Sequence, residues 1–175
     1  MSQKISFPQF GMEFLRNVFT EQRLKKELDK SFVRQVPINT KEATGTANIS
    51  SCTVRFLSGE GRPEWERVFD VFVPFNMYLQ IPVLLGNEHY NVNGQVRMRL
   101  WLEAYPPLVV YLNGAQVPPS EVQLTATGDG NWWNSDVAKK FGLEAKLKES
   151  MAKQFTEEFQ KSYESRRIDI MAQVK

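Results

Sequence analysis

The chain has 175 residues, of which 42% are hydrophobic and 24% are charged, and its formal net charge is +2 at pH 7. This composition fits a single domain over residues 1–175 with a substantial core, and it excludes a disordered chain. Because acidic and basic residues are interleaved, without a strongly basic stretch, we expect no nucleic-acid partner.

The N-terminal sequence MSQKISFPQF contains no apolar leader segment. No window approaches the 18 uninterrupted apolar residues of a membrane helix, so we expect no membrane span and a cytoplasmic location. Cys52 is the one cysteine, so it cannot form an internal disulfide. We expect it to behave as a small buried hydrophobe.

Between residues 7 and 33 the apolar residues recur with a helical period, but the stripe changes face near Phe19. Thr20 can cap a second helix, with Phe19 and Leu24 in the spacing of a hydrophobic staple. The sequence therefore predicts two helices that meet near Phe19 and Thr20, with one kinked helix as the alternative.

The segment from Val36 to Ala126 consists of strand patterns separated by glycine and proline turns. Its most informative stretch has nine apolar residues at consecutive odd positions: Phe69, Val71, Val73, Phe75, Met77, Leu79, Ile81, Val83 and Leu85. Strict alternation puts all nine on one face of a strand far longer than the mean of about 5 to 6 residues. Such a strand suits a sheet that wraps an elongated object, either the domain's own helix or an apolar ligand.

Five strands are predicted in this segment, at Gly45–Leu57, Trp65–Leu84, His89–Ala104, Leu108–Leu112 and Val122–Thr125. Neighbours joined by short turns should pair antiparallel. Two hairpin signals compete, and we place the turn at Gly86-Asn87 and interpret Gly94 as a bulge. Pro74 and Pro82 cannot donate ladder hydrogen bonds, so the long strand should be an edge, bulged or bent there.

Residues from about Asp136 to Glu164 predict a long amphipathic helix, with one apolar stripe formed by Val137, Phe141, Ala145, Leu147, Met151, Phe155, Phe159 and Tyr163. Alternation from Arg166 to Val174 predicts a last strand that re-enters the sheet. The expected fold class is α+β, in which a long, curved antiparallel sheet packs on a long C-terminal helix and the N-terminal helices close an end or side.

The sequence contains no P-loop, GxGxxG or GxSxG motif. Nucleotide hydrolysis, dinucleotide chemistry and acyl transfer therefore lack their usual sequence support. His89 is the only histidine, and without a partner at a diagnostic spacing we favour a solvent-exposed turn residue over a general base. One histidine and one cysteine make a metal site or cofactor unexpected. An acid/base pair assembled in space stays open, with Asp70, Glu103 and His89 as candidates.

Arg97, Arg99 and Glu103 alternate with apolar residues, so they lie on the face opposite Met98 and Leu100. The two arginines either hold a carboxylate or phosphate head group at a pocket mouth or belong to a solvated outer face, and we favour the second. For Trp132-Trp133, packing at the start of the long helix is favoured over a lid or a membrane anchor.

The order of helix, long antiparallel strands, long amphipathic helix and closing strand resembles one module of the tubular lipid-binding (TULIP) proteins, over about Phe10 to Val174. The patterns that carry the resemblance are Phe69–Leu85, Gln95–Ala104 and Val137–Tyr163. The resemblance implies a highly curved sheet that wraps a helix and leaves an apolar seam, and it implies an apolar class of ligand.

The leading hypothesis is a non-enzymatic binding or carrier domain for an elongated apolar molecule, such as a lipid or a hydrophobic metabolite. The ligand-lining residues would be Phe69, Val71, Val73, Phe75, Met98, Leu100, Met151 and Phe155, with no catalytic residue assigned. The alternatives are a cyclase or isomerase with a similar cavity, and an assembly protein whose apolar face is covered by a partner or by a second copy. The apolar run can also simply face the domain's own helix.

Overall fold

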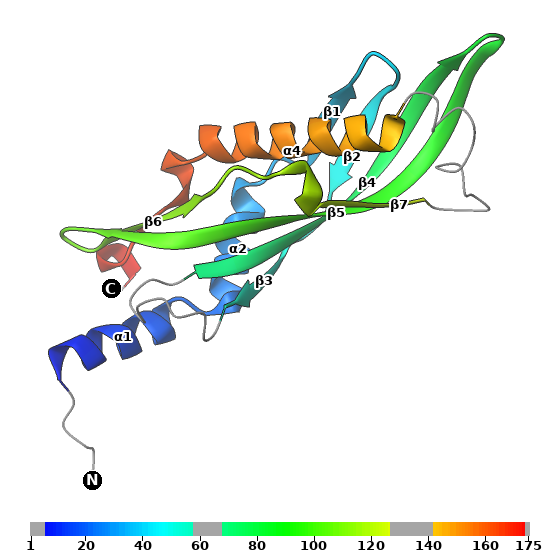
Figure 1. The fold of residues 1–175 in the computed structure, drawn as a ribbon. Coiled ribbons are helices and arrows are strands. Elements are labelled where there is room, and N and C mark those ends of the chain that lie inside the picture. Colours follow the sequence, from blue (N-terminus) through cyan, green and yellow to red (C-terminus); the bar gives the residue numbers. More distant parts are fainter. Residues whose placement is uncertain (1–5, 58–67, 127–141, 174–175) are drawn as a thin grey trace.

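The computed structural model describes residues 6–57, 68–126 and 142–173. Two helices open the chain, α1 (Phe7–Val18) and α2 (Glu21–Ser31). The strands are β1 (Gln35–Asn39), β2 (Thr44–Ile49), β3 (Thr53–Phe56), β4 (Val68–Val83), β5 (Gly86–Tyr105), β6 (Val109–Gly114), β7 (Val122–Ala126) and β8 (Arg167–Asp169). Helix α4 (Leu143–Lys161) precedes β8 and lies across one face of the sheet (Figure 1).

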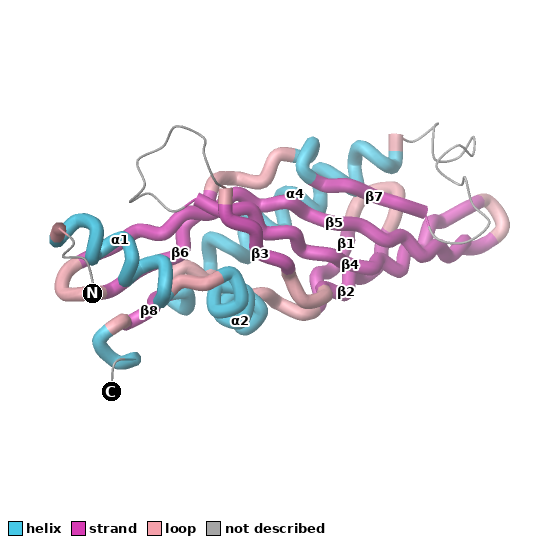
Figure 2. The backbone as a smooth tube through the Cα atoms, turned by 90° about the horizontal axis from the view of Figure 1, so that it is seen from below, coloured by secondary structure: helices cyan, strands magenta, loops and turns pink. Residues whose placement is uncertain are grey.

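The described strands form one curled, eight-stranded antiparallel sheet around the long β4–β5 hairpin. β2 and β3 both pair with β4, while β6 and β7 both pair with β5. β1 lies outside β2, and β8 lies outside β6. Figure 2 shows that the strands follow the long axis of the molecule. The predicted fold class is confirmed.

The β4–β5 hairpin keeps one register along its whole length, ending with Val83 opposite Gly86. Leu84 and Leu85 therefore form the turn, two residues before the predicted Gly86-Asn87 position, and Gly86 and Asn87 are paired in β5. Gly86 follows them with a φ of 137°, a conformation that residues with a Cβ atom rarely adopt. Both leucines are fully exposed, so the apolar face of β4 ends before Leu85 and the nine-residue expectation is too long.

The predicted bulge at Gly94 is wrong, because the ladder is unbroken where Gly94 pairs with Phe75. A Cβ atom on Gly94 would come within 2.2 Å of the Phe75 ring and 2.8 Å of the Gln123 carbonyl oxygen. The glycine is needed because the Phe75 ring lies directly against the backbone of β5.

The irregularity predicted at Pro74 lies in the strand beside it. β2 ends with Ile49 opposite Phe75, and β3 begins with Thr53 opposite Phe72, so four steps on this side face three steps on β4. The segment between β2 and β3 therefore contains one extra residue opposite Pro74. The ladder is interrupted there, so a proline removes fewer hydrogen bonds than it would elsewhere in β4.

The strand predictions differ from the structure at three places. The strand expected over residues 45–57 is two strands, separated by this interruption. β1 was not predicted, because its sequence contains Pro37; the proline is accommodated since β1 is an edge strand. The closing strand is confirmed as β8, which pairs with β6 but contains only three residues.

The inner face of the sheet is formed by the odd-numbered residues of β4 from Phe69 to Ile81, and it packs in one buried cluster with α2 and α4. Helix α4 contributes Leu143, Leu147, Met151, Ala152, Phe155 and Phe159. Ala145, which the predicted stripe included, is exposed, because the buried residues recur every four positions from 143 and leave 145 on the opposite side. Val137 and Phe141 lie outside the described residues.

The two-helix prediction for the N-terminal region is confirmed. Thr20 accepts a hydrogen bond from the Arg23 amide at 3.2 Å and caps α2. Phe19 and Leu24, the expected staple pair, are both fully buried.

Helix α2 also closes the exposed edge of β3. The Asp29 carboxylate accepts a hydrogen bond from the Cys52 amide at 2.8 Å, and the Glu21 carboxylate accepts one from the Phe56 amide at 3.0 Å. These amides lie at the two ends of β3, on its free edge. The two carboxylates therefore accept the hydrogen bonds that a further strand would otherwise accept.

Candidate functional site

The eight residues predicted to line an apolar site lie together where the inner face of the sheet meets α4. All eight, Phe69, Val71, Val73, Phe75, Met98, Leu100, Met151 and Phe155, belong to one buried cluster and are at most 4% exposed. The ring centroid of Phe155 is 6.4 Å from that of Phe75 on β4 and 6.4 Å from that of Phe32 after α2. These residues form the contact between the sheet and α4, so a ligand there would have to replace part of that contact.

The apolar seam between the inner face and α4 becomes more exposed toward both ends of the sheet. Ile81 is still buried, but Val83, two residues further along β4, is half-buried. On β5 the same change runs from buried Leu100 through half-buried Leu102 to exposed Ala104. The inner face is therefore fully buried in the middle of the hairpin and more exposed toward both of its ends.

Arg166 anchors the C-terminal end of α4, a role that the sequence analysis missed. This arginine is 3% exposed. Its Nε donates to the Leu112 carbonyl oxygen of β6 at 3.0 Å, and its Nη1 donates to the Phe159 carbonyl oxygen of α4. The guanidinium also lies over the Phe159 ring, 3.5 Å from its centroid. Burial lowers the pKa of Arg166 to about 10, which leaves it charged at neutral pH.

The N-terminal end of α4 is held by the buried side chains of Leu143 and Leu147 and by one ion pair, without a buried polar anchor like Arg166 among the described residues. The helix begins after Gly142, whose φ of 57° lies in the left-handed region, and no side chain caps this end among the described residues. An ion pair between Lys146 of α4 and Glu42 of the β1–β2 turn crosses the seam here. The Lys146 side chain is 44% exposed, so solvent screens this contact.

Asp70 is buried on the outer face of the sheet, between the two arginines that the sequence analysis singled out. Arg97 donates from Nε to Asp70 Oδ2 at 3.0 Å, and its Nη2 lies 2.8 Å from the same oxygen. Arg99 donates from Nε to Asp70 Oδ1 at 3.1 Å. The arginines therefore bind an internal carboxylate, and the Asp70 oxygens are occupied by guanidinium donors.

Glu103 accepts hydrogen bonds from four side chains. The donors are Trp101 Nε1 at 3.0 Å, Asn113 Nδ2 at 2.9 Å, and the hydroxyls of Tyr105 at 3.1 Å and Tyr163 at 3.3 Å. The bonds from Trp101 and Asn113 contribute most to lowering the pKa of Glu103. Burial, with Tyr105 and Glu103 nearby, raises the pKa of Tyr163 to about 12. Glu103 is thereby held ionised and is unsuited to act as a general acid.

His89 lies near the exposed end of the hairpin, where its ring stacks on Tyr78 at a centroid distance of 5.4 Å. His89 pairs with Gln80, whereas Asp70 lies ten residues away along β4, a distance of ~33 Å at ~3.3 Å per residue. Glu103 is further along β5 still. The three candidate acid/base residues are thus separate, and the described structure brings no two of them together.

Cys52 is 1% exposed, as expected for a small buried side chain. Burial, reinforced by the nearby Asp29 carboxylate, raises the pKa of the Cys52 thiol to about 12. A thiol that stays protonated at neutral pH is a poor nucleophile.

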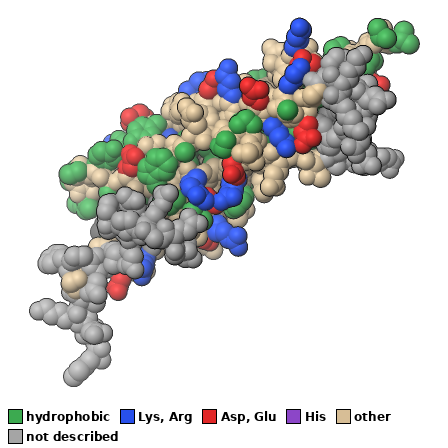
Figure 3. All heavy atoms as spheres, viewed as in Figure 1, with side chains coloured by type: hydrophobic (Ala, Val, Ile, Leu, Met, Phe, Trp, Pro, Cys, Tyr) green, Lys and Arg blue, Asp and Glu red, His purple; other side chains and the backbone are tan. Residues whose placement is uncertain are grey.

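Three pockets are formed by described residues; one of them includes Met98 of β5 in its lining and another includes Ala152 of α4. One, of about 410 Å³, follows α2. The other two, of about 370 Å³ and 400 Å³, lie on either side of the segment that joins β6 to β7. Figure 3 shows acidic and basic side chains close together over the visible face, and hydrophobic side chains at the end of the molecule that carries the β4–β5 turn.

Within the described ranges, no three His, Cys, Asp or Glu side chains are grouped so that they could hold a metal ion. None of the helices in those ranges has an 18-residue stretch apolar enough to cross a membrane. Trp132-Trp133 lies outside the described residues. No protein-family model matches the chain, and no curated protein matches its sequence.

Proposed function

We propose that the protein is a non-catalytic binding domain that takes up an elongated apolar molecule, a lipid or a hydrophobic metabolite, between the inner face of the sheet and α4. The observation that carries the proposal is the seam itself, in which one side of a single helix lies along a long face lined by apolar residues. Binding would gain ~25 cal/mol for each Å² of apolar surface removed from water. Few polar groups are needed to orient such a ligand.

The ligand enters by displacing the N-terminal half of α4 from the sheet. Arg166 holds the C-terminal end of the helix by hydrogen bonds, whereas the N-terminal end is held by the Lys146–Glu42 ion pair and by apolar contacts of Leu143 and Leu147, which an apolar ligand can replace. An apolar ligand replaces the contacts that Met151 makes with the sheet by contacts of the same kind. The net cost of opening is therefore small compared with opening into water.

The curled antiparallel sheet with its C-terminal helix is compatible with the TULIP-like architecture expected from the sequence. The proposal adds to this architecture an apolar ligand of the class that those proteins take. The cytoplasmic location and the formation of a homo-oligomer stay predictions.

The alternatives have less support. An assembly protein would need a partner to cover its apolar face, but α2 and α4 of this chain already cover the described part. A cyclase or isomerase would need an acid or base beside the seam. Asp70 and Glu103 are instead bonded to donors of the sheet, and His89 lies at the exposed end of the hairpin.

Native mass spectrometry of the purified protein, followed by solvent extraction, tests the proposal directly. We expect a bound apolar species, and we expect the stripped protein to take up an environment-sensitive apolar dye. If the stripped but folded protein takes up neither the dye nor any component of a lipid extract, the carrier function is wrong.

The route of entry has its own test. Lys146→Glu removes the ion pair with Glu42 and should speed dye uptake, because the N-terminal end of α4 is released. Lys153→Glu is the matched control on the same helix, since Lys153 is 74% exposed and lies 4.0 Å from Glu157, away from the seam. Equal uptake rates for the two variants would contradict entry at this end.

A further inference from the structure

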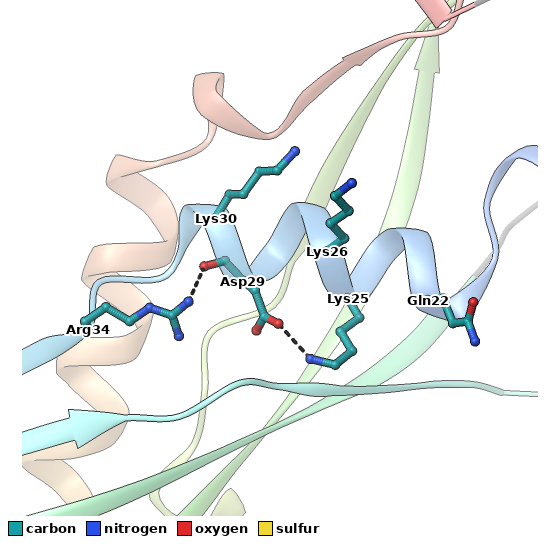
Figure 4. A pocket seen from close by; sticks show the side chains of 6 residues that line it. All are labelled: Gln22, Lys25, Lys26, Asp29, Lys30 and Arg34. Atoms are coloured by element: carbon teal, nitrogen blue, oxygen red, sulfur yellow. Dashed lines mark hydrogen bonds and ion pairs between the residues drawn. The ribbon is translucent and has the colours of Figure 1, made fainter.

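A shallow groove of about 410 Å³ runs along α2, remote from the seam. It is lined by Gln22, Lys25, Lys26, Asp29, Lys30 and Arg34 (Figure 4). Four cationic side chains and one carboxylate line the groove, and the Glu27 carboxylate lies 3.0 Å from Lys30 beside it. The local excess is therefore two positive charges. The whole chain has a net charge of only +2, so positive charge is concentrated at this groove.

The only carboxylate that lines the groove is already occupied. Asp29 accepts hydrogen bonds from Lys25 Nζ at 2.7 Å, Ser51 Oγ at 2.6 Å and the Cys52 amide at 2.8 Å. Burial alone would raise the pKa of Asp29, but these bonds, led by that from Lys25, outweigh it and lower the pKa to about 2. Asp29 therefore neutralises Lys25 and accepts the amide hydrogen bond at the start of β3. It does not neutralise the other cations of the groove.

Lys26 and Lys30 lie four residues apart along the exposed side of α2, and Arg34 follows the helix, which ends at Ser31. Arg34 donates from Nη2 to the Asp29 carbonyl oxygen at 3.3 Å. On a helix an interval of four residues separates neighbouring side chains by ~6 Å along the axis. Figure 4 shows the Lys26 and Lys30 side chains extending to the same side of α2. Lys30 lies 3.0 Å from Glu27, whereas Lys26 has no ion-pair partner among the residues that the structure describes.

We infer that the α2 groove binds the phosphate group of an anionic ligand. A phosphate monoester carries a charge of about −1.5 to −2 at pH 7, so one such group balances the excess of two positive charges. The ammonium groups of Lys26 and Lys30 and the guanidinium fork of Arg34 are common donors to phosphate oxygens. The groove is open to solvent, so it can receive either a soluble phosphate compound or a lipid head group.

The first experiment measures binding of the full chain to pyrophosphate, and to phosphatidylcholine vesicles with and without 30% phosphatidic acid. The double variant Lys26→Gln/Lys30→Gln should weaken phosphate binding by about tenfold or more, since each lost cation near an anionic surface is worth about fivefold. Added salt should weaken the wild-type interaction, because the groove is exposed.

The matched control is Lys153→Gln/Lys161→Gln on α4, which removes the same charge from side chains that are 74% and 69% exposed. This control should bind within about twofold of wild type. Thermal melting of all variants shows whether each stays folded. The control keeps the net charge of the two variants equal, so only the location of the lost cations differs.

Each outcome decides the inference. Pyrophosphate binding identifies a soluble phosphate compound as sufficient, and binding only to vesicles that contain phosphatidic acid identifies a lipid head group. Binding to neither probe, or equal loss in both double variants, overturns the inference. Poly-glutamate that binds as tightly as pyrophosphate also overturns it, because attraction to any anion would then suffice. None of these outcomes depends on an apolar ligand in the seam.

Discussion

The two faces of the β4–β5 hairpin bury their side chains in different ways. On the inner face, side chains such as Val73 and Met77 are fully buried because helices from distant parts of the chain cover them. On the outer face, Arg97 and Arg99 of the adjacent strand enclose the carboxylate of buried Asp70. Apolar burial therefore depends on the helices, whereas polar burial depends on the register of two neighbouring strands.

The strongest test of this difference places the same charge on each face. Val73→Asp should prevent folding or cost most of the free energy of unfolding, because an unpaired carboxylate would be buried among apolar residues. Tyr78→Asp, on the opposite face of the same strand, should cost less than ~1 kcal/mol, since Tyr78 is 48% exposed. Denaturant unfolding measures both. A folded Val73→Asp variant that binds dye normally would show that the inner face is not the binding face.

The next largest effect is expected at the helix side of the seam. Phe155→Ala should lower the free energy of unfolding by ~3 to 5 kcal/mol, because it removes a buried ring that contacts Phe75 and Phe32. Gln160→Ala, at an exposed position of the same helix, should change it by less than ~0.5 kcal/mol. A loss below ~1 kcal/mol for Phe155→Ala would mean that α4 contributes little to closing the inner face.

A smaller loss is expected on the outer face. Asp70→Ala should cost ~1 to 3 kcal/mol, because it leaves two guanidinium groups without the carboxylate that they enclose. Glu121→Ala is the control: its carboxylate lies 3.8 Å from Arg97 at an exposed position, so its loss should cost less than ~1 kcal/mol. Equal effects of the two substitutions would contradict the importance of strand register at Asp70.

Stability on the outer face should also depend on pH. The pKa of Glu103 is lower in the folded protein than its ordinary value of 4.5. The ionised group therefore stabilises the fold fully above pH 4.5, and this contribution is lost as the pH falls through the lowered pKa. Thermal midpoints of wild type and Glu103→Gln, measured from pH 7 to pH 3, should converge at the acid end. A difference that stays constant over this range would contradict the role of ionisation.

The smallest effect is expected at the exposed end of the hairpin. His89→Ala removes one ring of the stack with Tyr78 and should change the free energy of unfolding by less than ~0.5 kcal/mol. Uptake of apolar ligand should stay the same. Loss of turnover of a defined substrate in this variant, with binding and stability retained, would instead favour an enzyme with His89 as its acid or base.

Many elements could be predicted because their signals are local. The break at Thr20 follows from a cap and a staple within a few residues, and the inner face of β4 follows from strict alternation. These local signals also predicted the apolar faces of β4, β5 and α4 from which the eight seam residues come. The same local signals failed at Gly94, where a glycine that resembled a bulge is required by the ring of Phe75 on another strand.

What the sequence determined by itself is which side chains share a face, because the periods of helices and strands depend only on neighbouring residues. Tertiary structure alone decided what each face meets. Arg97 is 27 residues from Asp70, Tyr163 is 60 residues from Glu103, and Arg166 is 54 residues from Leu112. Such contacts depend on strand register and on the docking of α4, and no pattern within one segment specifies either. The sequence therefore determined the composition of the seam, and the tertiary structure determined that α4 closes it.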